Sequence, residues 1–177
     1  LQREDEILGR YKTLIGTPIL VMKIRIHGDY HLGQVLFTGT DFFIIDLEGE
    51  PVRSLGERRL KRSALQDVAG MLRSFHYAAY SGLFQSPTIK PKDIPALTHW
   101  ADLWNGYVGG TFVRSYRETV GDAPILPSDP KALEVLLHAF LLNKAIYELG
   151  YELNSRPDWV LLPLKGILSI LDMKTGT

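Results

Sequence analysis

The chain has 177 residues, 45% of them hydrophobic and 23% charged, which is the composition of an ordinary globular domain. Its 20 basic and 20 acidic residues balance, so no excess charge directs it toward nucleic acid or an anionic membrane. The absence of cysteine excludes disulfides and thiolate metal sites, and no apolar run approaches the roughly 18 residues of a membrane span. We therefore expect one domain, residues 1–177, in the cytoplasm, with neither nucleic acid nor membrane as a partner.

The first residues have the apolar spacing of an amphipathic helix. The residues at this spacing are Ile7, Leu8, Tyr11, Leu14 and Ile15. The pattern is already under way at the start of the chain, which lacks an initiator Met. We expect the chain to be a piece of a longer protein.

The next segments favour extended structure. Residues 21–26 alternate imperfectly between apolar and basic, which predicts a short strand ending at His27. Residues 34–37 and 42–45 are rich in strand-forming residues and flank the turn sequence of residues 38–41. The sequence therefore predicts a hairpin after the first strand.

Beyond residue 51 the apolar spacing becomes helical. Four helices are predicted, over residues 63–82, 95–120, 130–153 and 164–172. Asp129 or Ser128 precedes Pro130, a typical start for the third of them. The expected fold class is α+β, mostly α, with a short β-hairpin followed by a helical bundle.

The second of these helices has two unusual features. Gly106, Gly109 and Gly110 indicate either a weak helix or a close contact with another helix. Trp100 and Trp104 lie four positions apart on one helical face, and we expect them to pack in the core.

Oxygen-bearing side chains surround the predicted hairpin. Asp29 lies in a glycine-containing turn, where its carboxylate either completes the turn or orients a hydroxyl for attack on a phosphate. Gln34 and Asp46 offer oxygens of the kind that Mg²⁺ prefers, and Glu48 is a further candidate ligand. Asp46 ends an apolar run that we expect to be a buried strand, where a carboxylate is costly unless it is paired or bound to a metal. Together these spacings predict a small-molecule kinase.

Three more residues are candidates to support this loop. His27 and His31 lie four positions apart, but on a turn this spacing does not place them on one face as a zinc site would need. We interpret both as histidines that pack or hydrogen-bond within the loop. Asp67 lies in an otherwise apolar stretch and is a candidate to cap the backbone of the loop.

These residues carry a family resemblance. Residues 27–34, a hairpin and Asp46-Leu47-Glu48 resemble the aminoglycoside-phosphotransferase-like branch of the protein-kinase-like fold, with Gln34 in place of the usual Asn. Residues 71–79, 147–149 and 154–159 bring the likeness closer to bacterial maltokinases, including the kinase domains of trehalose synthase fusions. The resemblance covers residues 21–171.

The resemblance implies the C-terminal lobe of a kinase that uses ATP and Mg²⁺ to phosphorylate maltose at its anomeric hydroxyl. By motif, Asp29 would be the catalytic residue and Gln34 and Asp46 the metal ligands, with Glu48 as a further candidate. The N-terminal lobe that binds the nucleotide is largely absent from the chain, so we expect the isolated chain to be weak or inactive. A fused or associated trehalose synthase is an expected partner.

The acceptor site and two alternatives remain open at this point. Tyr147 and Tyr151 share a helical face and Arg156 follows, so all three are candidates to bind a sugar, although tyrosines at this spacing often pack instead. An aminoglycoside, choline or another sugar is the alternative acceptor. A lobe that only binds sugar or docks a partner is the alternative from another class.

Overall fold

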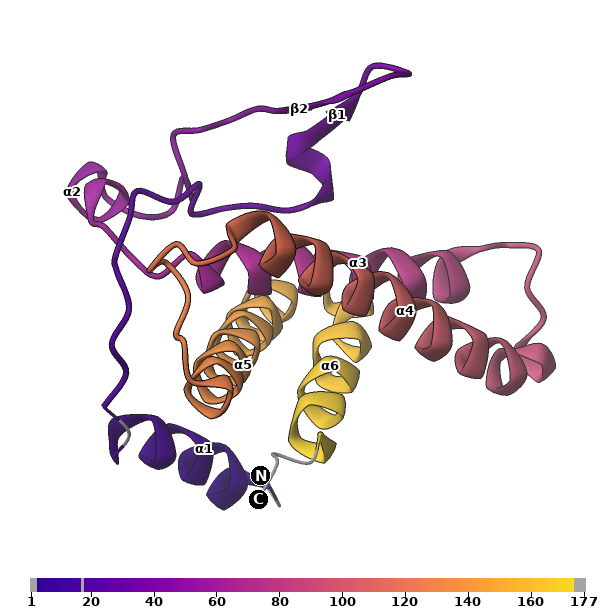
Figure 1. Cartoon of the computed structure of the whole chain (residues 1–177). Coiled ribbons are helices and arrows are strands. Elements are labelled where there is room, and N and C mark those ends of the chain that lie inside the picture. Colours follow the sequence, from indigo (N-terminus) through magenta and orange to yellow (C-terminus); the bar gives the residue numbers. More distant parts are fainter. Residues whose placement is uncertain (1–2, 17, 174–177) are drawn as a thin grey trace.

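The computed structural model describes residues 3–16 and 18–173 (Figure 1). Its elements are, in chain order, α1 (Glu4–Gly16), η1 (Leu32–Gln34), β1 (Val35–Phe37), β2 (Phe42–Ile44), α2 (Leu55–Arg59), α3 (Leu65–Gln85), η2 (Pro91–Asp93), α4 (Ile94–Val120), α5 (Pro130–Ser155), η3 (Pro157–Trp159) and α6 (Leu161–Asp172), where η marks a short 3₁₀ helix. The strands β1 and β2 pair antiparallel. The expected mostly helical fold with a small hairpin is confirmed. None of the described helices is long and apolar enough to cross a membrane.

Local signals explain where the helices begin. The Asp129 carboxylate accepts hydrogen bonds from the backbone N–H groups of Lys131 and Ala132, and Pro130 takes the first helical position of α5. Ser54 and Glu57 form a reciprocal capping box at the start of α2, a helix that we did not predict. The other predicted helices are present with ends shifted by a few residues.

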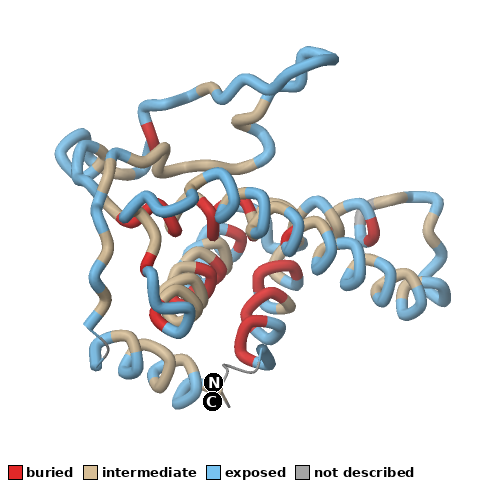
Figure 2. Tube along the Cα trace, in the orientation of Figure 1, coloured by how far each residue is buried: buried red, intermediate tan, exposed pale blue. Residues whose placement is uncertain are grey.

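The core lies between α3, α5 and α6. A buried cluster joins these helices, formed by Ala69, Leu141, Leu142, Ala145, Ile167, Ile170 and Leu171. Figure 2 shows this buried side of α5 and α6 in red, with α1 lying against the same bundle. Full burial of a side chain such as Leu142 stabilises the fold by about 1.5–3 kcal/mol. This packing gives α3 and α5 the fixed positions from which they hold the loop described below.

Three expectations about the core and the strands fail. The tryptophans of α4 are not core residues, since Trp100 is 67% exposed and Trp104 46% exposed. Residues 21–26 form no strand, because their only bridge pairs Ile24 with Arg62. The hairpin is also exposed on both strands, with Phe42 and Phe43 largely open to solvent, so Asp46 does not end a buried strand.

His76, in α3, is a buried titratable group. Burial, and then the charges of Arg73 and Lys165, lower its pKa from 6.5 to about 3. Between these two values the unfolded chain binds a proton that the folded chain does not, so stability falls as the pH falls. We expect His76→Phe to remove up to about 1.4 kcal/mol per pH unit of this dependence below pH 6.5. Denaturant unfolding at several pH values checks this.

The matched control for this experiment is the exposed His99. His99→Gln should leave the acid dependence of the unfolding free energy unchanged. If His76→Phe and the parent chain lose stability in parallel on acidification, the buried imidazole is not the group that titrates.

Candidate active site

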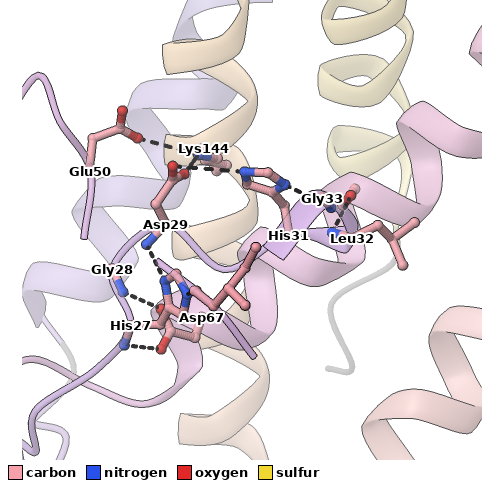
Figure 3. Close-up of polar contacts among 11 residues, drawn as sticks. His27, Gly28, Asp29, His31, Leu32, Gly33, Glu50, Asp67 and Lys144 are labelled. Carbon is pink, nitrogen blue, oxygen red and sulfur yellow. Dashed lines mark hydrogen bonds and ion pairs between the residues drawn. The ribbon is translucent and has the colours of Figure 1, made fainter. Parts of the chain in front are cut away.

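The turn at Gly28 and Asp29 is held by hydrogen bonds to Asp67, a residue of α3. The Asp67 carboxylate accepts a 2.7 Å hydrogen bond from the His27 backbone N–H and a 2.9 Å bond from that of Gly28 (Figure 3). Gly28 has φ +84°, a left-handed conformation that side chains with a Cβ disfavour. Burial raises the pKa of Asp67, and the two backbone hydrogen bonds partly oppose this. One carboxylate therefore fixes the backbone on which Asp29 is mounted.

The Asp29 side chain lies in a cleft between this turn and α5. Its carboxylate is 3.6 Å from the Lys144 ammonium, which in turn lies 3.9 Å from the Glu50 carboxylate. His31 Nε2 lies 3.8 Å from the other Asp29 oxygen. Figure 3 shows Glu50, Asp29 and His31 gathered around Lys144. The cleft thus presents carboxylate oxygens that can accept a proton or hold a hydroxyl or a cation.

Glu50 and Lys144 are site residues that the sequence reasoning missed. Burial raises the pKa of Glu50, the neighbouring Asp29 charge raises it further, and Lys144 opposes the shift. The available signal for Glu50 was its place in the turn two residues after Glu48. Lys144 lies three positions before Tyr147, whose ring it approaches at 5.3 Å, so the same helical face carries both.

The two loop histidines hydrogen-bond within the loop. His27 Nε2 lies 2.8 Å from the Ile45 carbonyl oxygen, and its Nδ1 is 3.4 Å from the Asp29 backbone N–H. A neutral imidazole with its proton on Nε2 satisfies both contacts and ties the hairpin to the loop. His31 Nδ1 accepts a 3.0 Å hydrogen bond from the Gly33 N–H.

The candidate metal ligands lie at the open end of the hairpin. The Gln34 carbonyl accepts the Ile45 N–H at 3.0 Å, so Gln34 and Asp46 stand on neighbouring strand ends. Asp46 has φ +57° and an exposed side chain, and Glu48 is exposed as well. Among the described residues, no three His, Cys, Asp or Glu side chains are grouped so as to hold a metal. The candidate metal ligands are the oxygen atoms of Gln34 and Asp46, which are of the kind that binds Mg²⁺.

The three predicted sugar-binding residues, Tyr147, Tyr151 and Arg156, differ in how many contacts they make within the chain. Arg156 donates to the buried Glu152 carboxylate at 2.9 and 2.7 Å and lies over the rings of Tyr151 and Trp159. Tyr147 and Tyr151 remain partly exposed. Only Tyr147 lines the cleft that contains Asp29. The structure therefore does not gather Tyr151 and Arg156 with the Asp29 carboxylate.

The structure matches a solved glucosamine kinase (crystal form B) with a TM-score of 0.77 at 24% identity, over 96% of this chain and 39% of that one. It matches a glucosamine kinase in complex with glucosamine, ADP and inorganic phosphate with a TM-score of 0.73 at 26% identity, over 97% of this chain and 40% of that one. The chain thus has the fold of part of these kinases.

Two relatives in sequence are also glucosamine kinases. One, from Streptacidiphilus jiangxiensis, is 26% identical over 169 residues, which is 96% of this chain and 35% of the relative. The other, from Mycolicibacterium smegmatis, is 29% identical over 181 residues, which is 99% of this chain and 41% of the relative. The chain spans about two-fifths of the length of these relatives. No family model matches it.

The expected resemblance to maltokinases is therefore wrong, because the relatives and structural neighbours are glucosamine kinases. The motifs behind that expectation maintain the lobe itself. Arg73, in residues 71–79, pairs with Glu148, in residues 147–149, and Arg156 is committed to Glu152. Such contacts carry little information about the acceptor. The expected trehalose synthase partner rested on the same resemblance and is withdrawn with it.

Proposed function

We propose that this chain is the C-terminal, catalytic and acceptor-binding lobe of an ATP-dependent sugar kinase, and that its acceptor is glucosamine. The observation that supports this most directly is the 26% identity, over 97% of the chain, to a glucosamine kinase bound to glucosamine, ADP and inorganic phosphate. The Asp29 cleft also contains a carboxylate that can accept the proton of a sugar hydroxyl, as this reaction requires. The remainder of the relatives' length leaves room for a lobe that holds the nucleotide.

In this proposal Asp29 acts on the attacking hydroxyl. Its carboxylate, rigidly mounted on the turn held by Asp67, orients the sugar hydroxyl and accepts its proton as the phosphoryl group is transferred. The Lys144 ammonium offsets the combined negative charge of Asp29 and Glu50 and keeps the two carboxylates in place. Phosphoryl transfer depends mainly on such positioning and charge compensation.

Gln34 and Asp46 would hold Mg²⁺, whose charge neutralises the phosphate oxygens. Their neutral and anionic oxygens stand on neighbouring strand ends and fit this ion. Glu48 is exposed two residues further on and is a weaker candidate ligand.

Glu50 gives the cleft a means to select an amino sugar. Glucosamine carries an ammonium group that glucose and maltose lack, and the mostly buried Glu50 carboxylate lies within the same cleft as Asp29. Tyr147 lines the same cleft, and its partly exposed ring can pack against a sugar. The enclosed part of the cleft measures about 40 Å³, so a sugar ring would lie across its mouth.

The test is a substrate panel on the full-length protein, with ATP, Mg²⁺ and glucosamine, glucose, maltose or an aminoglycoside, followed by ADP release. Loss of one charge-assisted hydrogen bond predicts about 10- to 150-fold lower kcat/KM for glucose than for glucosamine. Glu50→Gln should reduce this discrimination, whereas Glu118→Gln, at an exposed position of α4 outside the cleft, should retain it. Equal use of glucose, or preference for maltose, would refute the assignment of glucosamine.

A further inference from the structure

The glycines of α4 border an open groove that the proposed reaction does not use. The groove is lined by residues of α3, α4, α5 and α6 and has a volume of about 450 Å³. Of the three α4 glycines that line it, only Gly109 makes a close approach, since a Cβ there would lie 3.1 Å from Leu72 Cδ2. A Cβ at Gly106 or Gly110 would meet nothing within 4 Å. Two glycines therefore keep the groove open without serving helix packing.

The groove is separate from the cleft that contains Asp29. The cleft is lined by Gln66 and Gly70 of α3 and by Lys144 of α5, whereas the groove is lined by His76 of α3 and His138 of α5. The two sites have no lining residue in common. A ligand in the groove would not compete directly with a sugar.

The deep part of the groove holds polar groups without partners. His76 is 5% exposed and lines the groove, and neither ring nitrogen has a hydrogen-bond partner among the described residues. His138 Nδ1 is buried and unpartnered in the same part of the structure. Native proteins satisfy nearly all buried polar atoms with protein groups, water or a ligand. These nitrogens indicate that a polar atom occupies the inner groove.

The rim of the groove is positively charged and its walls are apolar. Arg114 and Arg117 lie almost one turn apart on α4, are exposed, and make no ion pair within residues 3–16 and 18–173. The third arginine, Arg73, is engaged by Glu148 at 2.7 Å. The apolar wall residues include Leu72, Val113, Leu137, Leu141 and Ile170.

We propose that this groove binds a small amphipathic carboxylate with a polar group at its far end. Its anionic group lies on Arg114 and Arg117, its hydrocarbon body lies along the leucine and isoleucine walls, and its far polar atom hydrogen-bonds His76. The volume is within the range of small-molecule sites. A sugar phosphate or a nucleotide fits less well, because its hydroxyl groups would face apolar walls.

The test is calorimetric titration of the full-length protein with 3-(4-hydroxyphenyl)propionate. We expect saturable binding, weakened about tenfold or more for the methyl ester, which lacks the charge, and weakened also for 3-phenylpropionate, which lacks the far hydroxyl. Arg114→Gln with Arg117→Gln should weaken the parent probe by a similar factor. Absence of binding up to about 1 mM would overturn the proposal, as would equally tight binding of inorganic phosphate.

A second test uses a variant that fills the groove with a side chain and is expected to fold. Gly110→Leu places a side chain in the groove from a Cβ position with no neighbour within 4 Å, and it replaces a glycine that disfavours helix. We expect it to abolish binding, whereas Gly82→Leu, on an exposed part of α3 with equally free space, should leave binding intact. Unchanged binding in Gly110→Leu would place the probe elsewhere and refute the site.

Discussion

Asp29→Asn is expected to lower kcat/KM for phosphoryl transfer by about 10²–10⁴-fold in the full-length protein. The substitution keeps the size of the side chain but removes the group proposed to take the proton of the attacking hydroxyl. It also leaves Lys144 with Glu50 as its remaining anionic neighbour at the cleft. Steady-state ADP release with saturating ATP measures the effect.

A matched carboxylate far from the cleft serves as the control. Asp122 is exposed in the segment between α4 and α5, and Asp122→Asn should keep full activity. Both variants should unfold at the temperature of the parent protein within a few degrees. An Asp29→Asn protein that retains parental turnover would remove the proposed catalytic role and favour a lobe that binds or docks without catalysis.

Asp67→Ala is expected to have the largest effect on stability among single changes at the site. The substitution leaves the backbone N–H groups of His27 and Gly28 without the carboxylate that accepts them at 2.7 and 2.9 Å. A donor left without its acceptor costs up to about 1–3 kcal/mol, and both of these are partly buried, so the free energy of unfolding should fall by about 2–5 kcal/mol. Denaturant unfolding of the parent and the variant checks this value.

The conservative variant Asp67→Asn separates the two hydrogen bonds. Asparagine keeps one acceptor oxygen, so we expect a loss of stability between those of the parent and the alanine variant. Activity should fall with both variants because Asp29 is carried by the same turn. If Asp67→Ala unfolds like the parent, the carboxylate does not support the loop.

The helical part of the fold was predictable because its signals are local. Asp129 and Pro130 mark the start of α5 through backbone hydrogen bonds and a fixed φ, both of which act within a few residues. The apolar spacing of α3 likewise reports the face that packs against α5 and α6. The strand predicted over residues 21–26 is absent for the opposite reason. A strand forms only where a partner strand lies beside it, and of these residues Ile24 alone pairs, in a single bridge with Arg62.

The site was predictable only in part. Asp29 and Asp67 were recognised from the sequence, but Glu50 and Lys144 become neighbours of Asp29 only when the turn after the hairpin and α5 dock on the same side of α3. The maltokinase resemblance was wrong: the relatives and structural neighbours are glucosamine kinases, and Arg156, one of the residues behind the resemblance, pairs with Glu152 within the lobe.

By itself, the sequence determined that this protein is mostly helical, with a hairpin, and that a carboxylate-bearing loop lies between its first helix and the later ones. The tertiary structure alone decided the surroundings of Asp29, the exposure of Trp100 and the open groove along the glycines of α4. The physical reason is range. Caps, turns and helical spacing act between residues close in the chain, whereas charge pairs, burial and cavities depend on helices that meet from distant positions.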